Sequence, residues 1–162
     1  MAPRIRTATL DDAAAIAFIH NDAIASRRST METEPKTEER VRRWLDALGP
    51  RQSALVADED GVVGWGLIKR YSDRPGYDPC GETSVFLHPE HLGRGIGTTL
   101  KRAVIEEARR LGYTNLLARI MSVNAASIAY NRRLGYREVG VLRRVGCLDG
   151  VWHDVTVMQL QL

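Results

Sequence analysis

Three glycines at alternate positions, between a short apolar strand and an amphipathic helix, constrain this chain more than any other feature of its sequence. The strand pattern covers residues 82–88, the glycines are Gly93, Gly95 and Gly97, and the helical pattern covers about 98–111. Glycine lets the backbone adopt positive φ and approach a ligand closely. The N–H groups at the start of the helix then point into the loop, where the helix dipole favours negative charge. The stretch predicts an anion-binding turn; the alternative is a tight turn in which the glycines serve only the backbone.

Two common phosphate-binding patterns do not fit this turn. Counting from Gly93, the dinucleotide pattern G-x-G-x-x-G requires a glycine where Thr98 stands, and the P-loop pattern requires a lysine directly after Gly97. A third arrangement, R-G-x-G after a strand, matches Arg94–Gly97. In that arrangement a pyrophosphate lies across the start of the helix.

The order of apolar patterns along the chain predicts an α/β fold with a mixed sheet flanked by helices. Alternating apolar positions and turn signals predict about seven strands, at 4–10, 54–57, 62–68, 82–88, 115–121, 136–143 and 151–162. Helical periodicity predicts about four helices, at about 11–24, 37–48, 98–111 and 125–134. Hairpins and strand-helix-strand units occur together, which favours a mixed, mostly antiparallel sheet over a fully parallel one. With no linker or repeat, residues 1–162 are expected to form a single domain.

One face of the helix at 98–111 is expected to be buried. Leu100, Val104 and Ala108 lie on an apolar stripe, whereas Lys101 and Arg102 are expected to face water.

Composition excludes several classes of protein. The chain is 44% hydrophobic and 27% charged, close to the soluble globular average. A net charge of +3 is too small for a nucleic-acid footprint, and no apolar run reaches the ~18 residues that span a bilayer. We therefore expect neither a nucleic-acid nor a membrane partner. Cys80 and Cys147 form no metal-binding or disulfide pattern, and the first residues lack the apolar stretch of a signal peptide, so a cytoplasmic protein without a metal is expected.

Two segments carry a family resemblance. Pro89–Leu100 resembles motif A of the GNAT acyl-CoA N-acyltransferases, with Gly95–Gly97 as its core and Leu92 where the family has Gln or Arg. Asn124–Ser127 followed by Leu134–Tyr136 is similar to the second signature of that family. The resemblance implies the GNAT fold and acetyl-CoA as co-substrate.

Five further blocks resemble the phosphinothricin acetyltransferase branch, which includes enzymes that acetylate methionine sulfone and methionine sulfoximine. The blocks are Ser29–Thr30, Thr33–Pro35, Arg74–Tyr77, Glu82–Val85 and Gly150–Val155. This resemblance implies acetylation of the α-amine of a small amino acid or analogue, and a homodimer.

The resemblance implies that the coenzyme is bound by residues of two segments. They are Val85, Phe86, Leu87, Gly93, Arg94, Gly95, Ile96, Gly97, Thr98, Asn124 and Ser127. At 85–87 the main chain is expected to pair with the pantetheine arm, because core packing already accounts for the side chains. Asn124 is equally well explained as the N-cap of the next helix.

Glu82 is the candidate general base. It opens the strand that leads into the glycine-rich turn, so it is expected at the centre of the sheet, where it would accept the amine proton directly or through a water. The resemblance points to the same residue. A glutamate at a strand end is, by itself, more often solvated.

The general acid is less clear from the sequence. Many family members carry a Tyr four residues before the helix-ending glycine, and the branch often has His; here that residue is Asn131, which cannot donate a proton. Tyr130 is the candidate, although a one-residue offset turns a helical side chain by ~100° and core packing is the alternative.

Three residues are candidates for binding the acceptor. Arg74 is suited to clamp a carboxylate, phosphinate or sulfonyl oxygen, while Tyr77 and Trp152 would wall the pocket. A solvated charge is the alternative for Arg74. Where the branch tends to have an aromatic residue and an Arg, this chain has Met31 and Glu32, which favours a less anionic acceptor.

The leading hypothesis is an acetyl-CoA-dependent N-acetyltransferase of a small-molecule amine, without a covalent intermediate. The alternatives are acetylation of a protein N-terminus or a polyamine, a CoA-binding module without turnover, and an α/β interaction domain with structural glycines.

Overall fold

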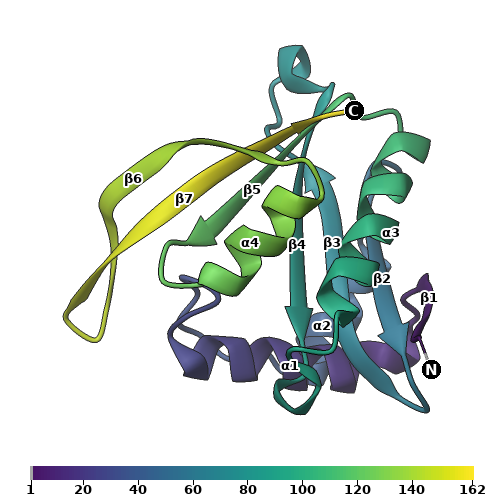
Figure 1. Cartoon of the computed structure of the whole chain (residues 1–162). Helices are drawn as coiled ribbons and strands as arrows, with labels where there is room; N and C mark the ends of the chain where they lie inside the picture. The colour runs from purple at the N-terminus through teal and green to yellow at the C-terminus, as the bar shows by residue number, and fades with distance from the viewer. Residues whose placement is uncertain (1) are drawn as a thin grey trace.

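The central strand of a mixed sheet leads directly into the glycine-rich turn (Figure 1). The computed structural model describes residues 2–162. Over that range the sheet has seven strands in the order β1-β2-β3-β4-β5-β7-β6. They are β1 (Arg4–Thr7), β2 (Ser53–Asp58), β3 (Val62–Arg70), β4 (Cys80–Leu87), β5 (Asn115–Met121), β6 (Arg137–Leu148) and β7 (Val151–Gln161). The β4–β5 pair is parallel and the other neighbours are antiparallel, which confirms the predicted fold class.

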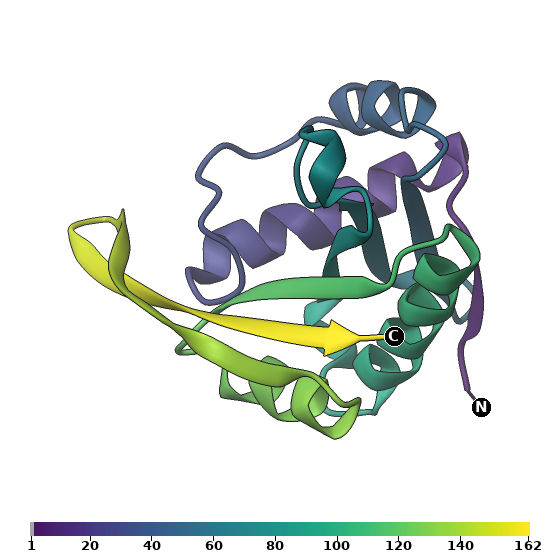
Figure 2. The same ribbon diagram turned by 90° about the horizontal axis from the view of Figure 1, so that it is seen from above.

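Helices cover both faces of the sheet. Within residues 2–162 there are four of them: α1 (Ala13–Ser26), α2 (Glu38–Asp46), α3 (Ile96–Arg110) and α4 (Ala125–Arg133). Figure 2 shows α1 and α2 on one face and α3 and α4 on the other. The long β6–β7 hairpin extends away from these layers as an arm (Figures 1 and 2).

Each face of the sheet has its own apolar core. On the α1 face, Ile16 and Ile19 pack with Trp65 of β3. On the α3 face, Leu100 and Val104 pack with residues of β2, β3 and β5. The predicted stripe of α3 is therefore confirmed, and burial of these side chains supplies much of the driving force for folding.

Lys101 does not follow the prediction for α3. Its residue exposure is 2%, so the expectation that it faces water is wrong. It lies one residue after Leu100 on the edge of the apolar stripe, and β4 lies close enough to cover it.

Two glycines of β3 bring α3 close to the sheet. A Cβ at Gly66 would lie 2.7 Å from Cγ2 of Val104, and one at Gly64 would lie 2.7 Å from Cδ2 of Leu87. A side chain at either position would force Val104 or Leu87 to shift. The small residues of β3 therefore leave room for side chains of α3 and β4 against that strand.

β4 and β5 separate after a short stretch of pairing. Within the described residues their parallel register runs from Cys80–Asn115 to Glu82–Leu117. Beyond Glu82, β4 keeps β3 as its partner on one side, but β5 diverges toward α4 (Figure 1). The sheet is therefore split along the part of β4 that leads into the glycine-rich turn.

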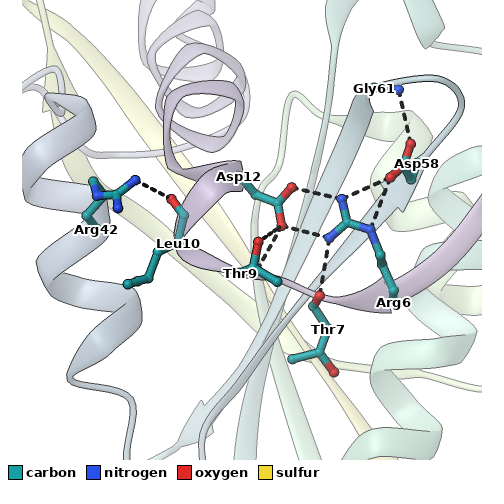
Figure 3. Close-up of polar contacts among 8 residues, drawn as sticks. All are labelled: Arg6, Thr7, Thr9, Leu10, Asp12, Arg42, Asp58 and Gly61. Carbon is teal, nitrogen blue, oxygen red and sulfur yellow. Dashed lines mark hydrogen bonds and ion pairs between the residues drawn. The ribbon is translucent and has the colours of Figure 1, made fainter.

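A guanidinium joins three elements at the β1 edge of the sheet (Figure 3). Arg6 of β1 donates to Asp12 at 2.7 and 2.8 Å and to Asp58 of β2 at 2.9 and 3.0 Å. The Asp12 carboxylate also accepts from the N–H of Thr9 at 2.7 Å. The Arg6–Asp12–Asp58 network therefore fixes the start of α1 against the edge of the sheet.

We expect Asp12→Asn to lower the free energy of unfolding at pH 7 by about 1–3 kcal/mol, because charge-assisted hydrogen bonds from Arg6 weaken. The hydrogen bond from Arg6 lowers the pKa of Asp12 below its ordinary 3.8. Stabilisation is therefore complete above that ordinary value and is lost as the pH falls through the lower folded pKa. Urea unfolding at several pH values tests this. The gap between wild type and variant should narrow in acid, whereas the exposed neighbour Asp11→Asn should show no gap at pH 7; equal curves for both variants would contradict the prediction.

Candidate active site

A cleft of about 600 Å³ opens where β4 and β5 separate. Asp22 and Ser26 line it from the α1 face of the sheet, and Gly97 and Lys101 line it from the α3 face. The cleft thus passes through the split in the sheet and connects its two faces. Two molecules can approach one point in it from opposite sides.

Positive charge predominates along the cleft. Among its lining residues in the range 2–162, the charged ones are Arg28, Lys101, Arg119, Arg133 and a single acid, Asp22. A cleft of one predominant charge raises the local concentration of ligands of the opposite charge. This one favours an anionic ligand.

The glycine-rich turn forms one end of the cleft. Gly93 and Gly95 have φ of 75° and 78°, which is strained for residues with a side chain. Gly95 is the N-cap of α3, so the helix begins at Ile96, two residues earlier than predicted. The first N–H groups of a helix have no intrahelical acceptor, and Gly93, Gly95, Gly97 and Thr98 all line the cleft. An anion at this end of the cleft would meet those amides.

Two side chains of the turn point away from the cleft. Ile96 is buried in the core on the α3 face, and its exposure is 2%. Arg94 pairs with Glu59 of the β2–β3 turn at 3.0 Å. Neither side chain lines the cleft, so binding through the main chain is the role that this geometry leaves open to both residues.

The split edge of β4 forms the floor of the cleft. Val85, Phe86 and Leu87 all line it. Val85 and Leu87 pack on the α3 core, while Phe86 stacks on Trp65 with ring centroids 5.2 Å apart. The side chains are thus engaged in packing, as expected, and the backbone on the β5 side of this segment has no strand partner within residues 2–162.

α4 forms the opposite wall. The side chain of Asn124 accepts from the N–H of Ser127 at 3.2 Å, so it is the N-cap of α4, and both residues also line the cleft. Tyr130 and Asn131 line it one turn further along. Burial raises the pKa of Tyr130, so its hydroxyl stays protonated. The buried Oδ1 of Asn131 has no hydrogen-bond partner in the described chain, which leaves an acceptor free for a ligand.

Glu82 is buried near the point where the strands separate, and its exposure is 7%. Nη2 of Arg119 lies 2.9 and 2.8 Å from its two carboxylate oxygens, and Nζ of Lys69 lies 3.7 Å from one of them. These two cations offset the desolvation of the ionised carboxylate. Arg119 lines the cleft, whereas Glu82 lies behind it. Arg119 was not anticipated, although a charge within the apolar run Leu116–Met121 is a signal for it.

Lys101 is the second residue that the sequence analysis did not assign to the site. Its Nζ donates to Oγ1 of Thr83 at 2.6 Å, and Oγ1 lies 2.8 Å from the hydroxyl of Tyr136. Thr83 and Lys101 both line the cleft. Burial lowers the pKa of Lys101 to about 7.

The three predicted acceptor-binding residues do not line the cleft. Arg74 and Tyr77 are exposed in the β3–β4 loop, where the ring of Tyr77 packs edge-on against Tyr71 at 5.4 Å. Trp152 is exposed on the arm beneath the guanidinium of Arg144. Within one copy of residues 2–162 the structure therefore does not bring these three together, and their role stays a prediction.

The Met31–Glu32 pair is held by neighbouring residues. Glu32 lies 2.7 Å from Nε2 of His20 and 2.6 Å from Nζ of Lys36. Met31 packs against Gly146 of the arm, where a Cβ would clash with its Cε. The charge of Glu32 is thus balanced within its own loop, which weakens the argument that this acid repels an anionic acceptor.

Two other features are absent from residues 2–162. No three His, Cys, Asp or Glu side chains in this range gather closely enough to hold a metal ion. No helix in the same range is long and apolar enough to cross a membrane.

Comparison with known proteins places this cleft in context. Residues 4–137 match the acetyltransferase (GNAT) domain family. The chain is 36% identical over 162 residues to the L-methionine sulfoximine/L-methionine sulfone acetyltransferase of Salmonella typhimurium, covering 98% of this chain and 94% of that one.

Two solved structures share the fold. A GNAT superfamily phosphinothricin acetyltransferase from Sinorhizobium meliloti, in complex with acetyl-CoA, superimposes with a TM-score of 0.93 at 30% identity, covering 100% of this chain and 89% of that one. A ribosomal-protein-alanine N-acetyltransferase from Brucella melitensis superimposes with a TM-score of 0.92 at 35% identity, covering 98% and 99%.

Proposed function

Because this chain belongs to the GNAT acetyltransferase family, we propose that it transfers the acetyl group of acetyl-CoA to the α-amine of a small amino acid or analogue, of the methionine sulfone or methionine sulfoximine type. The observation that carries the proposal is the cleft through the split sheet, which has an anion-binding turn at one end and the buried Glu82 beside it. Phosphinothricin is included in the acceptor class through the similarity to the Sinorhizobium meliloti enzyme.

The coenzyme fits the α3 side of the cleft. Its pyrophosphate would lie on the amides of Gly95–Thr98, where the helix dipole favours negative charge. Its pantetheine arm would pair with the open edge of Val85–Leu87 as an added strand does. The free Oδ1 of Asn131 is placed to accept from one of the arm's amides. A main-chain N–H of β4 would polarise the thioester carbonyl.

Direct transfer needs no covalent intermediate. The amine nitrogen bonds to the acetyl carbon, the carbon–sulfur bond breaks, and the electron pair leaves on sulfur. Glu82 takes one proton of the ammonium before the attack, directly or through a water, and passes it to solvent; it then takes the second proton that the nitrogen loses as the amide forms. This makes Glu82 the general base of the proposed reaction.

Arg119 links the base to the choice of acceptor. Its guanidinium lies between Glu82 and the cleft and is planar, which suits a carboxylate. The α-carboxylate of an amino acid acceptor would pair with the guanidinium of Arg119 in place of Glu82. The carboxylate of Glu82 would then face the ammonium of the same acceptor. A polyamine has no carboxylate with which to do so, which favours amino acids over polyamines.

Acetylation of a protein N-terminus is the second candidate, favoured by the similarity to the Brucella melitensis enzyme. The carboxyl group next to a protein's N-terminal amine is part of a peptide bond, so this acceptor would not engage Arg119 in the same way. The acceptor assay below distinguishes the two.

We also propose that the enzyme works in the cytoplasm. Cys80 and Cys147 are both free thiols, which suits a reducing compartment.

We further propose a homodimer, built on the arm. Large apolar side chains are exposed along the β6–β7 hairpin: Val139, Leu142, Val145, Val151 and Trp152. Several large apolar side chains exposed on one hairpin are typical of an interface. We expect sedimentation to give the mass of a dimer for the wild type and of a monomer for Val145→Asp. A wild-type monomer at micromolar concentration would contradict the proposal.

Acetyl-CoA at 100 times its Kd should stabilise the protein by about 2.7 kcal/mol in thermal unfolding. Gly97→Val should reduce this gain, because a Cβ at Gly97 lies 3.3 Å from Leu87 and its branches would enter the cleft. Gly140→Val on β6 is the control, since a Cβ there meets nothing within 4 Å in the described chain. An unchanged gain for Gly97→Val would place the coenzyme elsewhere.

Thiol release over a panel of acceptors tests the activity itself. We expect turnover with methionine sulfone, methionine sulfoximine or phosphinothricin, and little with spermidine or an alanine-initiated peptide. Faster turnover of the peptide would favour the second candidate, and no turnover with any acceptor would leave a coenzyme-binding module.

Glu82→Gln should lower kcat at neutral pH by about 10²–10⁴-fold, the usual contribution of a general base. Its acetyl-CoA stabilisation should remain, since Glu82 does not line the cleft. The solvent-facing Glu106→Gln serves as control and should keep wild-type kcat. Full activity of Glu82→Gln would refute the assignment of the base.

A further inference from the structure

A buried ammonium without a counter-ion lies beside the proposed thioester site. Lys101 of α3 has an exposure of 2%, and its Nζ donates to Oγ1 of Thr83 at 2.6 Å. Over residues 2–162 it forms no ion pair with a carboxylate. Its other close neighbour is the ring of Tyr136, with Nζ 4.9 Å from the ring centroid. Burying an unpaired cation is costly, so this lysine calls for an explanation beyond packing.

The position of Lys101 is complementary to that of Glu82. Successive side chains of a strand point to opposite faces, so Thr83 faces α3 while Glu82 faces the other side of the sheet. Both residues lie where β4 and β5 begin to separate. The base is thus on the acceptor face, and Lys101 with Thr83 is on the face proposed for the coenzyme.

One proton of the hydrogen-bonded cluster of Lys101, Thr83 and Tyr136 is available to a ligand. Lys101 donates to Oγ1 of Thr83, and the hydroxyl of Tyr136, 2.8 Å away, can donate to the same oxygen. Thr83 then keeps its own hydroxyl hydrogen, whose present acceptor, the carbonyl of Leu117, is 3.4 Å away. A better acceptor in the cleft would replace that long contact.

We propose that Lys101, acting through the hydroxyl of Thr83, supplies the proton that the departing thiolate of coenzyme A takes up. This rests on the proposed acetyl transfer. As the carbon–sulfur bond breaks, the sulfur takes the hydroxyl proton of Thr83, and Oγ1 takes a proton from the Lys101 ammonium. Lys101 is left neutral and regains a proton from solvent, while Glu82, having passed the first proton of the ammonium to solvent, holds the second one that the nitrogen loses. Thr83 would touch the sulfur; Lys101 is a relay residue behind it.

The groups around Lys101 allow it to titrate near neutral pH. Burial lowers the pKa of Lys101 from 10.5 to about 7. Thr83 of β4 and Tyr136 contact its Nζ, and the other residues that line the α3 side of the same cleft are Ala118 and Ile120 from β5 and Tyr130 and Asn131 from α4. Burial raises the pKa of both tyrosines, so they stay neutral in this range. Arg119 points to Glu82 on the other face. A proton donor of this kind is half charged at about pH 7 and loses its remaining charge as the pH rises further.

The pH dependence of kcat tests the relay, with methionine sulfone as acceptor. In the wild type, kcat should fall on the alkaline side as Lys101 loses its proton. Lys101→Met and Thr83→Val should each lower kcat by about 10²-fold and remove that limb, while Tyr130→Phe should keep it. Thr83→Val retains the lysine, so it answers the question even if Lys101→Met does not fold. An unchanged limb in Thr83→Val, or its loss in Tyr130→Phe, would overturn the proposal.

A binding measurement separates this inference from the proposed activity. Coenzyme A with its free thiol is titrated on the protein, and thiolate absorbance is followed in the ultraviolet. A nearby ammonium should make the bound thiol ionise at a pH about one to three units lower than in free coenzyme A, and Lys101→Met should abolish the difference. Equal ionisation in both proteins would overturn the relay without bearing on acetyl transfer. Absence of turnover together with this difference would refute the proposed function alone.

Discussion

The architecture depends on the short parallel pairing between β4 and β5. The paired part can pack closely because residue 81 is a glycine. A Cβ there would lie 2.7 Å from the side chain of Ile68 and 3.2 Å from that of Leu116. Beyond Glu82 the β5 side of β4 has no strand partner within residues 2–162. Unpaired backbone groups are costly unless water or a ligand satisfies them. An extended ligand with amides of its own, such as pantetheine, meets that requirement.

The same split sets the chemistry on its two sides. Because side chains alternate along β4, consecutive residues at the point of separation face different partners. Glu82 pairs with Arg119 and Lys69, and Thr83 pairs with Lys101, which has no carboxylate beside it in the described chain. The carboxylate of Glu82 and the ammonium of Lys101 therefore lie on opposite faces of the sheet at the point of separation, without pairing with each other.

The sequence predicts the backbone elements of this site better than the positions of its charged side chains. The element order, the glycine turn and the Asn124 cap follow from local patterns, and each is present in the structure. Lys101 was misassigned because helical periodicity places it at the edge of the stripe, where only the position of β4 decides its burial. The Glu82–Arg119 pair joins residues on neighbouring strands, so the pattern of residues along one strand does not predict it. Long-range packing decided both cases.

The unpaired Lys101 couples the stability of the folded protein to ligand binding. A buried ammonium satisfied by one hydroxyl reduces stability, and part of that cost appears as its lowered pKa. An anion bound on the α3 side of the cleft would offset the cost by favouring the charged form. In the proposed reaction, the same attraction is strongest when negative charge develops on the leaving sulfur, a step that follows binding. A residue that destabilises the protein without its ligand thus stabilises most the step at which negative charge develops. This is how electrostatic preorganisation lowers a barrier.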